Sequence, residues 1–359
     1  MLKINTEVLK SMVARAVRGS SDNKLIPLSS LMLIELKDNK LTLVTTDATN
    51  YLYITRPIEG DDFYIVVQAE QFSKLISKLT CQNVELNITD DALEVKGNGS
   101  YKIDIPLDDG EPIKYPDPLR SIKLNKKSKK DIVASDIQHV LVSCKPALAT
   151  TLETPCYTGY YIGDKVITTN QEMISAFKKQ LLGKDVLISA EYMDLLSVIS
   201  SDKFSVYVVG DDIVCQSDDC TVCGKLMEEV SDFAYDEISE LLDRDFDSEC
   251  EISKNEILAL LERISLFVGE YDDFAIQLLF TEEGLQIESM KSNGVEIIPY
   301  IKSEGFSAFK CLMDIRSLTN LVKAYPDDAI ICQYGDDSCL KFESETVTFI
   351  ISTVEEGNE

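Results

Sequence analysis

Apolar residues recur at helical spacing in two segments near the N-terminus. In the first, one face at 100° per residue carries Leu9, Met12, Val13, Ala16 and Val17. In the second, one face carries Phe72, Leu75, Ile76 and Leu79. Basic side chains lie opposite both apolar faces. Between the two segments, residues 31–47 alternate around an Asp-Asn turn, which predicts a β-hairpin.

The second helical segment, QAEQFSKLISKL, returns as SAEYMDLLSVIS and LMDIRSLTNLVK. The copies start at Glu70, Glu191 and Asp314, spacings of 191 − 70 = 121 and 314 − 191 = 123 residues. Each copy is followed by a strand, a short acidic turn and another strand, and is preceded by a helix and a strand pair. A repeat of this length is a domain rather than one unit of a solenoid.

The repeat predicts three α+β domains of one architecture, each with two helices packed on antiparallel sheets. Their expected bounds are 1–119, 120–244 and 245–359. The linkers are expected in the proline-rich segment from Asp108 to Ser121 and in the acidic segment from Glu240 to Glu249.

Composition narrows the possible functions. The 359 residues are 45% hydrophobic, which is enough to form cores, and the net charge of −27 argues against non-specific adhesion to nucleic acid or anionic membrane by the whole surface. No apolar run approaches the ~20 residues that cross a bilayer, and no signal peptide is evident, so we expect a soluble, cytoplasmic protein without a membrane partner. The ten cysteines are therefore expected to be reduced thiols.

The candidate catalytic and metal motifs are weak. Cys220 and Cys223 form a lone C-x-x-C without a second pair or a nearby histidine. The YGDD sequence at 334–337 resembles a polymerase metal turn, but VGDD and ITDD occupy the same place in the other copies. His139, the only histidine, has no evident Ser or Cys partner. We therefore expect no enzyme activity, no metal and no cofactor.

Across the whole chain, the order of elements resembles the bacterial DNA polymerase III beta sliding clamp. The similarity rests on LKINTEVLKSMV, IPLSSLMLIELKDNKLTLVTTD, YIVVQAEQFSKLISKL and the threefold repeat. It implies a processivity factor with three clamp domains per chain, without catalytic activity of its own. A head-to-tail homodimer would form a ring around duplex DNA, with helices inside and sheets outside, and tether the replicative polymerase.

Helix geometry agrees with a ring of two chains. Twelve helices at about 10 Å each give a circumference of roughly 120 Å and an opening near 28 Å, wide enough for a duplex about 20 Å across. Six helices would leave only about 9 Å. Sequence-independent contacts inside the ring would fall on basic side chains. The candidates are Lys10, Arg15, Arg18, Lys24, Lys74, Lys78, Lys127, Lys145, Arg263, Arg316 and Lys323. The second helix of the middle copy lacks a lysine, which departs from this pattern.

The resemblance also implies two protein contacts. Tyr101 and Ile103 of one chain would meet Leu266 and Phe267 of the other, with an internal core position as the alternative for these residues. The polymerase and the clamp loader would bind through a peptide pocket at Thr169, Ile174, Ile238, Ile350, Ser352 and Val354. Here the family's Thr-Asp-Gly-His-Arg-Leu becomes TNQEMI, and the C-terminal end STVEEGNE is more polar.

Two other classes of function stay open. One is an adaptor with the clamp fold that binds proteins without encircling DNA, although the basic helices argue against it. The other is a hydrolase that uses paired carboxylates such as Asp336 and Asp337.

Overall fold

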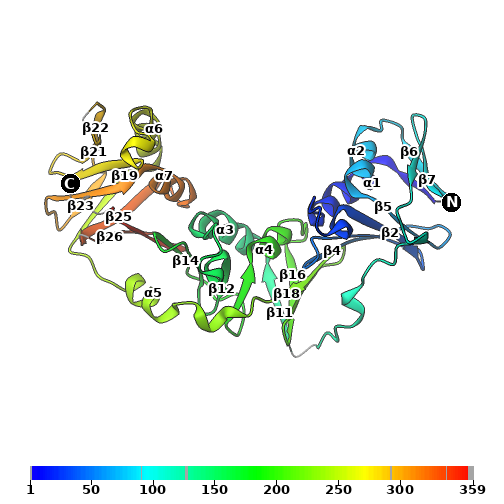
Figure 1. Ribbon diagram of the computed structural model, residues 1–359. Helices are drawn as coiled ribbons and strands as arrows, with labels where there is room; N and C mark the ends of the chain where they lie inside the picture. The colour runs from blue at the N-terminus through cyan, green and yellow to red at the C-terminus, as the bar shows by residue number, and fades with distance from the viewer. Residues whose placement is uncertain (1, 90, 126–127, 292, 337, 355–359) are drawn as a thin grey trace. The chain divides into compact units, whose positions relative to one another are not determined.

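The computed structural model describes residues 2–89, 91–125, 128–291, 293–336 and 338–354 (Figure 1). One order of elements occurs three times: a strand, a helix, four strands, a helix and three strands. The first repeat contains β1 (Leu2–Asn5), α1 (Thr6–Ala16), β2 (Leu31–Lys37), β3 (Lys40–Thr46), β4 (Tyr51–Pro57), β5 (Phe63–Gln68), α2 (Ala69–Lys78), β6 (Asn83–Ile88), β7 (Ala92–Lys96) and β8 (Ser100–Asp104).

The second and third repeats follow the same order. The second contains β11 (Lys129–Val133), α3 (Ala134–Cys144), β12 (Gly159–Ile162), β13 (Val166–Thr169), β14 (Met173–Phe177), β15 (Val186–Ser189), α4 (Ala190–Leu196), β16 (Lys203–Val209), β17 (Asp212–Gln216) and β18 (Cys220–Lys225). The third contains β19 (Ser248–Ser253), α6 (Lys254–Ile264), β20 (Ala275–Phe280), β21 (Leu285–Ser289), β22 (Val295–Ile298), β24 (Phe309–Asp314), α7 (Ile315–Ala324), β25 (Ala329–Asp336), β26 (Cys339–Glu343) and β27 (Val347–Ser352).

Shorter elements lie between and within the repeats. They are β9 (Leu107–Asp108), β10 (Glu111–Pro112), α5 (Tyr235–Leu242) and β23 (Lys302–Glu304). The predicted first linker begins at the last residue of β9 and contains β10, and the second begins inside α5. In the described part of the chain, no helix is both long and apolar enough to cross a membrane.

Local sequence explains where several helices begin. The Asn5 side chain accepts hydrogen bonds from the backbone N–H groups of Glu7 and Val8 at the start of α1. Ser253 caps α6 in the same way, and Asp314 caps α7. A side-chain acceptor at this position satisfies N–H groups that lack a partner within the helix.

The chain folds into two compact units that share the middle repeat. Unit 1 contains Met1–Ile137 and Glu191–Leu226, and unit 2 contains Gln138–Ala190 and Met227–Glu359. Unit 1 holds an eight-stranded sheet of order β11-β16-β17-β18-β4-β3-β2-β5, and unit 2 a nine-stranded sheet of order β15-β12-β13-β14-β27-β26-β25-β19-β23. In both sheets, strands of two repeats pair: β18 with β4, and β14 with β27. The division into three domains at 119/120 and 244/245 stays a prediction.

Each of these sheets has a helix face and a linker face. On the helix face of unit 1, the Thr45 hydroxyl donates to the Ala16 carbonyl at the end of α1. In unit 2, the Thr168 hydroxyl donates to the Cys144 carbonyl at the end of α3. Because side chains alternate along a strand, the neighbouring residues Val44 and Thr169 point to the other face. There the linker segments cover the sheets, as Figure 1 shows for α5 in unit 2.

Two apolar clusters fill the space beneath the linkers. The first-linker cluster contains Leu31, Leu33, Val44, Tyr53, Val66, Tyr115, Val214 and Cys223. The second-linker cluster contains Cys156, Tyr161, Ile167, Ile174, Ala176, Leu187, Phe233, Ile238, Leu242, Cys339 and Ile350. Each cluster combines residues of two successive repeats, so the linkers help to hold the joined sheets together.

A largely buried ion pair joins the first and second repeats on the helix side of unit 1. Arg15 of α1 donates two hydrogen bonds to the Asp219 carboxylate, the shorter of them 2.7 Å, and a third to the Val198 carbonyl. The Arg15 hydrogen bond lowers the pKa of Asp219, and Arg56 lies 3.4 Å from the same carboxylate. Asp219 is therefore ionised at neutral pH and holds Arg15 in place.

We expect Arg15→Met to lower the free energy of unfolding by roughly 1–3 kcal/mol, because it removes charged hydrogen bonds from a partly covered site. The exposed Arg18→Met is the matched control and should leave stability nearly unchanged. The pKa of Asp219 is lower in the folded chain, so its contribution is present above about pH 4 and is lost as the pH falls further. Thermal unfolding between pH 3 and 7 tests this, and equal stability of both variants at pH 7 contradicts it.

Candidate functional site

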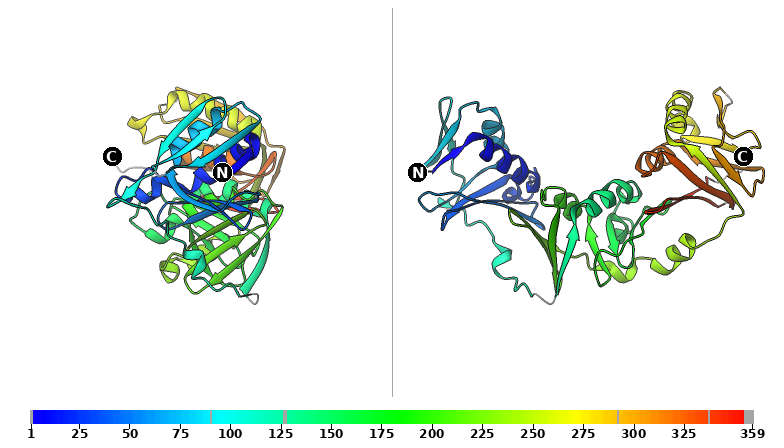
Figure 2. Two further views of the ribbon diagram at one scale, coloured as in Figure 1. Left: turned by 90° about the vertical axis from the view of Figure 1, so that its right-hand side faces the viewer. Right: turned by 180° about the vertical axis from the view of Figure 1, so that it is seen from behind.

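Ten of the eleven candidate DNA contacts lie in the described residues, and Lys127 lies outside them. Most belong to helices α1, α2, α6 and α7 or to the turns that follow α1 and α3. Figure 2 shows α1 with α2, and α6 with α7, each pair lying together on its own unit. Within each unit the basic side chains are therefore carried by the layer that covers the helix face.

Four of these side chains are exposed and make no ion pair with any described residue: Arg18, Lys24, Lys78 and Lys323. Lys78 and Lys323 occupy the last turns of α2 and α7, where a positive charge also favours the helix dipole. Lys145 is exposed as well, in the turn after α3, beside α7 in unit 2. Arg18, Lys24, Lys78 and Lys323 can attract phosphate without first breaking an ion pair to a described residue.

Five other candidates already have a carboxylate partner on the same unit, and three of them form simple exposed pairs. Lys10 lies 3.0 Å from Glu7, and Lys74 lies 2.5 Å from Glu70. Arg263 binds Glu296 through two hydrogen bonds, which lower the pKa of that carboxyl group. Such exposed pairs are weak and exchange readily with other partners.

Arg316 is paired and also held over an aromatic ring. Its guanidinium lies 2.5 Å from Asp314 and 3.7 Å from the centre of the Phe274 ring. The ring fixes the orientation of the planar group. Arg15, in contrast, is held by Asp219 and has only 16% of its side chain exposed, so its main role in unit 1 is structural.

The middle repeat contributes fewer charges, as its sequence predicts. Helix α4 has only seven residues and no basic side chain in its last turn. Its Tyr192 and Met193 are buried. The basic character of the helix layer therefore depends on the first and third repeats and on the turn after α3.

The residues of the predicted peptide pocket are partly brought together. Ile174, Ile238 and Ile350 belong to the second-linker cluster, and Thr169 pairs with Ile174 across β13 and β14. All four are buried, with exposed fractions of at most 7%. They form the floor of the site on the linker face of unit 2.

The other two pocket residues lie at the end of β27. Ser352 is exposed, and its N–H group donates to the Glu172 carbonyl. Val354 is 39% exposed and forms an isolated bridge with Leu312. A polar and an apolar side chain, Ser352 and Val354, are therefore exposed at this end of β27.

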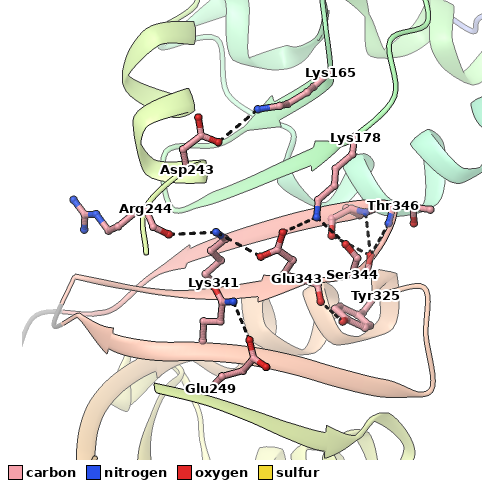
Figure 3. A network of polar contacts seen from close by, with 12 residues as sticks. Lys165, Lys178, Asp243, Arg244, Glu249, Tyr325, Lys341, Glu343, Ser344 and Thr346 are labelled. Carbon is pink, nitrogen blue, oxygen red and sulfur yellow. Dashed lines mark hydrogen bonds and ion pairs between the residues drawn. The ribbon is translucent and has the colours of Figure 1, made fainter. Parts of the chain in front are cut away.

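A polar network that the sequence did not suggest fastens the second linker to the sheet (Figure 3). Lys178 of repeat two lies 2.6 Å from Glu343 of repeat three. Lys341 donates to the Arg244 carbonyl at 3.2 Å and lies 3.6 Å from Glu343. Burial would raise the pKa of Glu343, but the two lysines lower it.

Register places Lys341 directly beside the predicted pocket. Lys341 pairs with Ile350, and Ile350 pairs with Ile174, so the three side chains share the linker face. In the sequence, this structural role of Lys341 is indicated by the position of a lysine among apolar strand residues. Its carbonyl partner lies 97 residues away in the sequence and could not be located from the pattern.

The candidate interface residues divide into exposed and buried positions. Leu266 and Phe267 form a turn after α6 and are 80% and 49% exposed. Tyr101 is 38% exposed on β8, the last strand of the sheet β1-β6-β7-β8. Ile103 is only 1% exposed, so it fills the core of unit 1 and is not available on the surface of a single chain. Both residues lie on one face of the sheet, because Tyr101 pairs with Val95 and Ile103 pairs with Leu93, and they differ only in exposure.

Three side chains of the weak catalytic motifs, Cys220, Cys223 and Tyr334, are buried in the fold. Cys220 and Cys223 are buried, three residues apart on β18, and burial raises the pKa of each thiol to about 12. Tyr334 of the YGDD sequence is fully buried, with its ring 4.0 Å from that of Phe280. The Asp336 side chain and Asp337 lie outside the described residues. In the described part of the chain, no cluster of three His, Cys, Asp or Glu side chains could hold a metal.

Comparisons with known proteins agree with the architecture. The sequence model described as "DNA polymerase III beta subunit, N-terminal domain" matches residues 1–113. The chain is similar to the sliding clamp of Bacillus subtilis, with a TM-score of 0.84 and 17% identity over 99% of both chains. The DNA polymerase III beta chain of Streptococcus pneumoniae gives a TM-score of 0.86 and 14% identity over 99% of this chain and 100% of that one.

A third similar structure extends the range of organisms. The beta subunit of Thermotoga maritima gives a TM-score of 0.83 and 13% identity over 99% of both chains. A comparison with curated proteins gave no match. The three structural likenesses establish that the chain has the sliding-clamp fold over essentially its whole length.

We expect the triple variant Arg18→Ala, Lys78→Ala, Lys323→Ala to bind duplex DNA about tenfold more weakly at low salt, because three unpaired charges are removed from the helix layer. The dependence of affinity on salt should flatten in parallel. The matched control is Lys37→Ala, Lys123→Ala, Lys184→Ala, which removes three exposed charges outside the helices. Fluorescence anisotropy with a labelled duplex measures the affinity and its salt dependence for both triple variants. Equal losses of affinity in the two variants contradict the assignment of the helix layer as the DNA-binding surface.

Proposed function

We propose that this protein is a sliding DNA clamp, a ring of two chains that encircles duplex DNA and tethers a replicative polymerase. The observation that carries the proposal is the likeness of the entire chain to structures titled as DNA polymerase sliding clamps. The exposed basic side chains on the helix layer support it, because they occur in a chain with a net charge of −27. The acidic remainder repels DNA from other surfaces.

A ring that is held on DNA by its closed shape is consistent with this distribution of charge. A ring held on DNA by closure needs few phosphate contacts, and contacts without base recognition allow sliding. Several basic side chains in the helix layer are paired with nearby carboxylates, which keeps the lining only moderately attractive to phosphate. Strong, fixed contacts would oppose movement along the duplex.

Two chains are required by the size of the duplex. Three repeats supply six helices and two chains supply twelve, and only twelve leave an opening near 28 Å. We propose that the outer strand β8 with Tyr101 meets the turn of Leu266 and Phe267 on the other chain. Exposed apolar side chains at both places support this contact.

The second-linker cluster is the proposed docking site for the polymerase and for a clamp loader. Ile174, Ile238 and Ile350 supply its apolar floor, with Ser352 and Val354 at the edge. The proposed role needs no catalytic group, metal or cofactor. It would place the protein in the cytoplasm with the DNA it serves.

Retention on closed DNA tests the function. The protein is diluted until dimers dissociate, mixed with nicked circular plasmid and concentrated so that rings close around the DNA. After gel filtration at about 0.5 M salt, which screens ordinary phosphate contacts, we expect protein to stay on the circle. Cutting the plasmid once should release it. Equal retention before and after cutting, or no retention at all, contradicts a sliding clamp and favours an adaptor that binds proteins only.

The double variant Leu266→Asp, Phe267→Asp should give monomers, because it places charges in the proposed apolar contact. Sedimentation velocity at several concentrations measures the mass. Leu152→Asp is a matched control, since Leu152 is 78% exposed outside that contact. A double variant that stays dimeric contradicts the assigned interface.

A further inference from the structure

Unit 1 contains a cavity of about 490 Å³ on the linker face of its eight-stranded sheet. Its floor is formed by Leu33, Val44 and Tyr53, and its walls include Tyr64 and Tyr115. Leu33 and Val44 are paired across β2 and β3, and Val44 and Tyr53 across β3 and β4, so these side chains share one face. Binding sites in proteins commonly have this size, and this one combines an apolar floor with polar and charged side chains around it.

The cavity exists because the first linker is attached to the sheet at two points, Tyr115 and Asp117. The buried Tyr115 donates its hydroxyl to the Leu31 carbonyl at 3.1 Å, and its N–H group donates to the Tyr64 hydroxyl at 2.7 Å. Asp117 accepts a hydrogen bond from the Tyr53 hydroxyl at 3.1 Å. The sheet between and beside these anchors is left partly uncovered.

The second linker covers its own sheet differently. There α5 packs Ile238 and Leu242 into the second-linker cluster. The first linker offers only a short 3-10 turn, Pro118–Arg120, in the corresponding place. The difference in linker structure explains why an open cavity occurs in unit 1.

Charge at the rim of the cavity is unbalanced. Arg120 lies 2.6 Å from Asp117 and 3.9 Å from Glu35, so the two lining carboxylates already face a cation. Lys40 and Lys114 also line the cavity, are exposed, and make no ion pair with any residue that the structure describes. A local surplus of positive charge is unusual on a chain with a net charge of −27.

We propose that this cavity, the first-linker groove, binds a short peptide of a partner protein that carries large apolar side chains next to Asp or Glu. The apolar floor would take one or two bulky side chains, and Lys40 and Lys114 would pair with the flanking carboxylates. This site goes beyond the proposed clamp function, because the docking site for the polymerase lies on the sheet of the other unit. It is independent of whether the chain encircles DNA.

Two labelled peptides test the groove on the full-length protein: acetyl-Glu-Asp-Leu-Phe-Asp-Glu-amide and acetyl-Lys-Lys-Leu-Phe-Lys-Lys-amide. By fluorescence anisotropy, we expect the acidic peptide to bind at least about tenfold more tightly. The overall charge of the protein favours the basic peptide, so acidic preference must come from a local site. Absence of binding by the acidic peptide up to about 1 mM overturns the proposal.

Variants locate the bound peptide. Lys40→Glu with Lys114→Glu should weaken the acidic peptide about tenfold while leaving the thermal unfolding temperature unchanged, since both side chains are exposed. Thr42→Trp should fill the cavity, because Thr42 lines it. If Thr42→Trp does not fold, the two lysine changes alone decide the outcome.

Ser352→Trp is the matched control at the proposed polymerase docking site, and it should not affect the acidic peptide. Loss of binding in Ser352→Trp but not in the lysine variant would place the peptide on unit 2 and overturn the first-linker groove. Unchanged binding in the lysine variant overturns it as well. The plasmid-retention experiment does not depend on these outcomes. The sliding-clamp proposal and the first-linker groove can therefore be refuted independently of each other.

Discussion

The arrangement within each unit depends on strand pairing between successive repeats. In unit 1, β18 of the second repeat pairs with β4 of the first, and in unit 2, β14 of the second pairs with β27 of the third. Each pairing extends a sheet without interrupting its alternation of side chains. One face is therefore left for the helices and the other for the linkers. Charge and apolar docking surfaces are thus separated by the thickness of a sheet.

The proposed function uses this separation. The helix layers of both units carry exposed basic side chains. Several of these form ion pairs with nearby carboxylates such as Glu7, Glu70 and Glu296. The linker faces carry the apolar clusters, where partner peptides could bind without competing with DNA. The same logic distinguishes the two linker sites: a helix packs into the second cluster, whereas a thin, twice-anchored segment leaves a cavity over the first.

Local pattern was enough to predict the repeated helices, the hairpins and the α+β architecture, because periodicity and turn residues are short-range signals. The family resemblance, not local pattern, grouped Ile174, Ile238 and Ile350; all three lie in the second-linker cluster, and their role as a peptide pocket stays a prediction. Contacts between distant segments were beyond the reach of local pattern. The ion pair of Arg15 with Asp219 spans 204 residues, and the burial of Ile103 depends on how its sheet packs. A basic residue on a helix can serve either a phosphate or a neighbouring carboxylate, and sequence alone does not separate these roles.

The central claim is that two chains close into a ring wide enough for duplex DNA. Electron microscopy of the purified protein at a concentration that favours association tests it most directly. The account predicts closed rings of two chains with an opening near 28 Å, lined by the helix layers of both units. Particles that are only single chains, or dimers without a central opening, would contradict it.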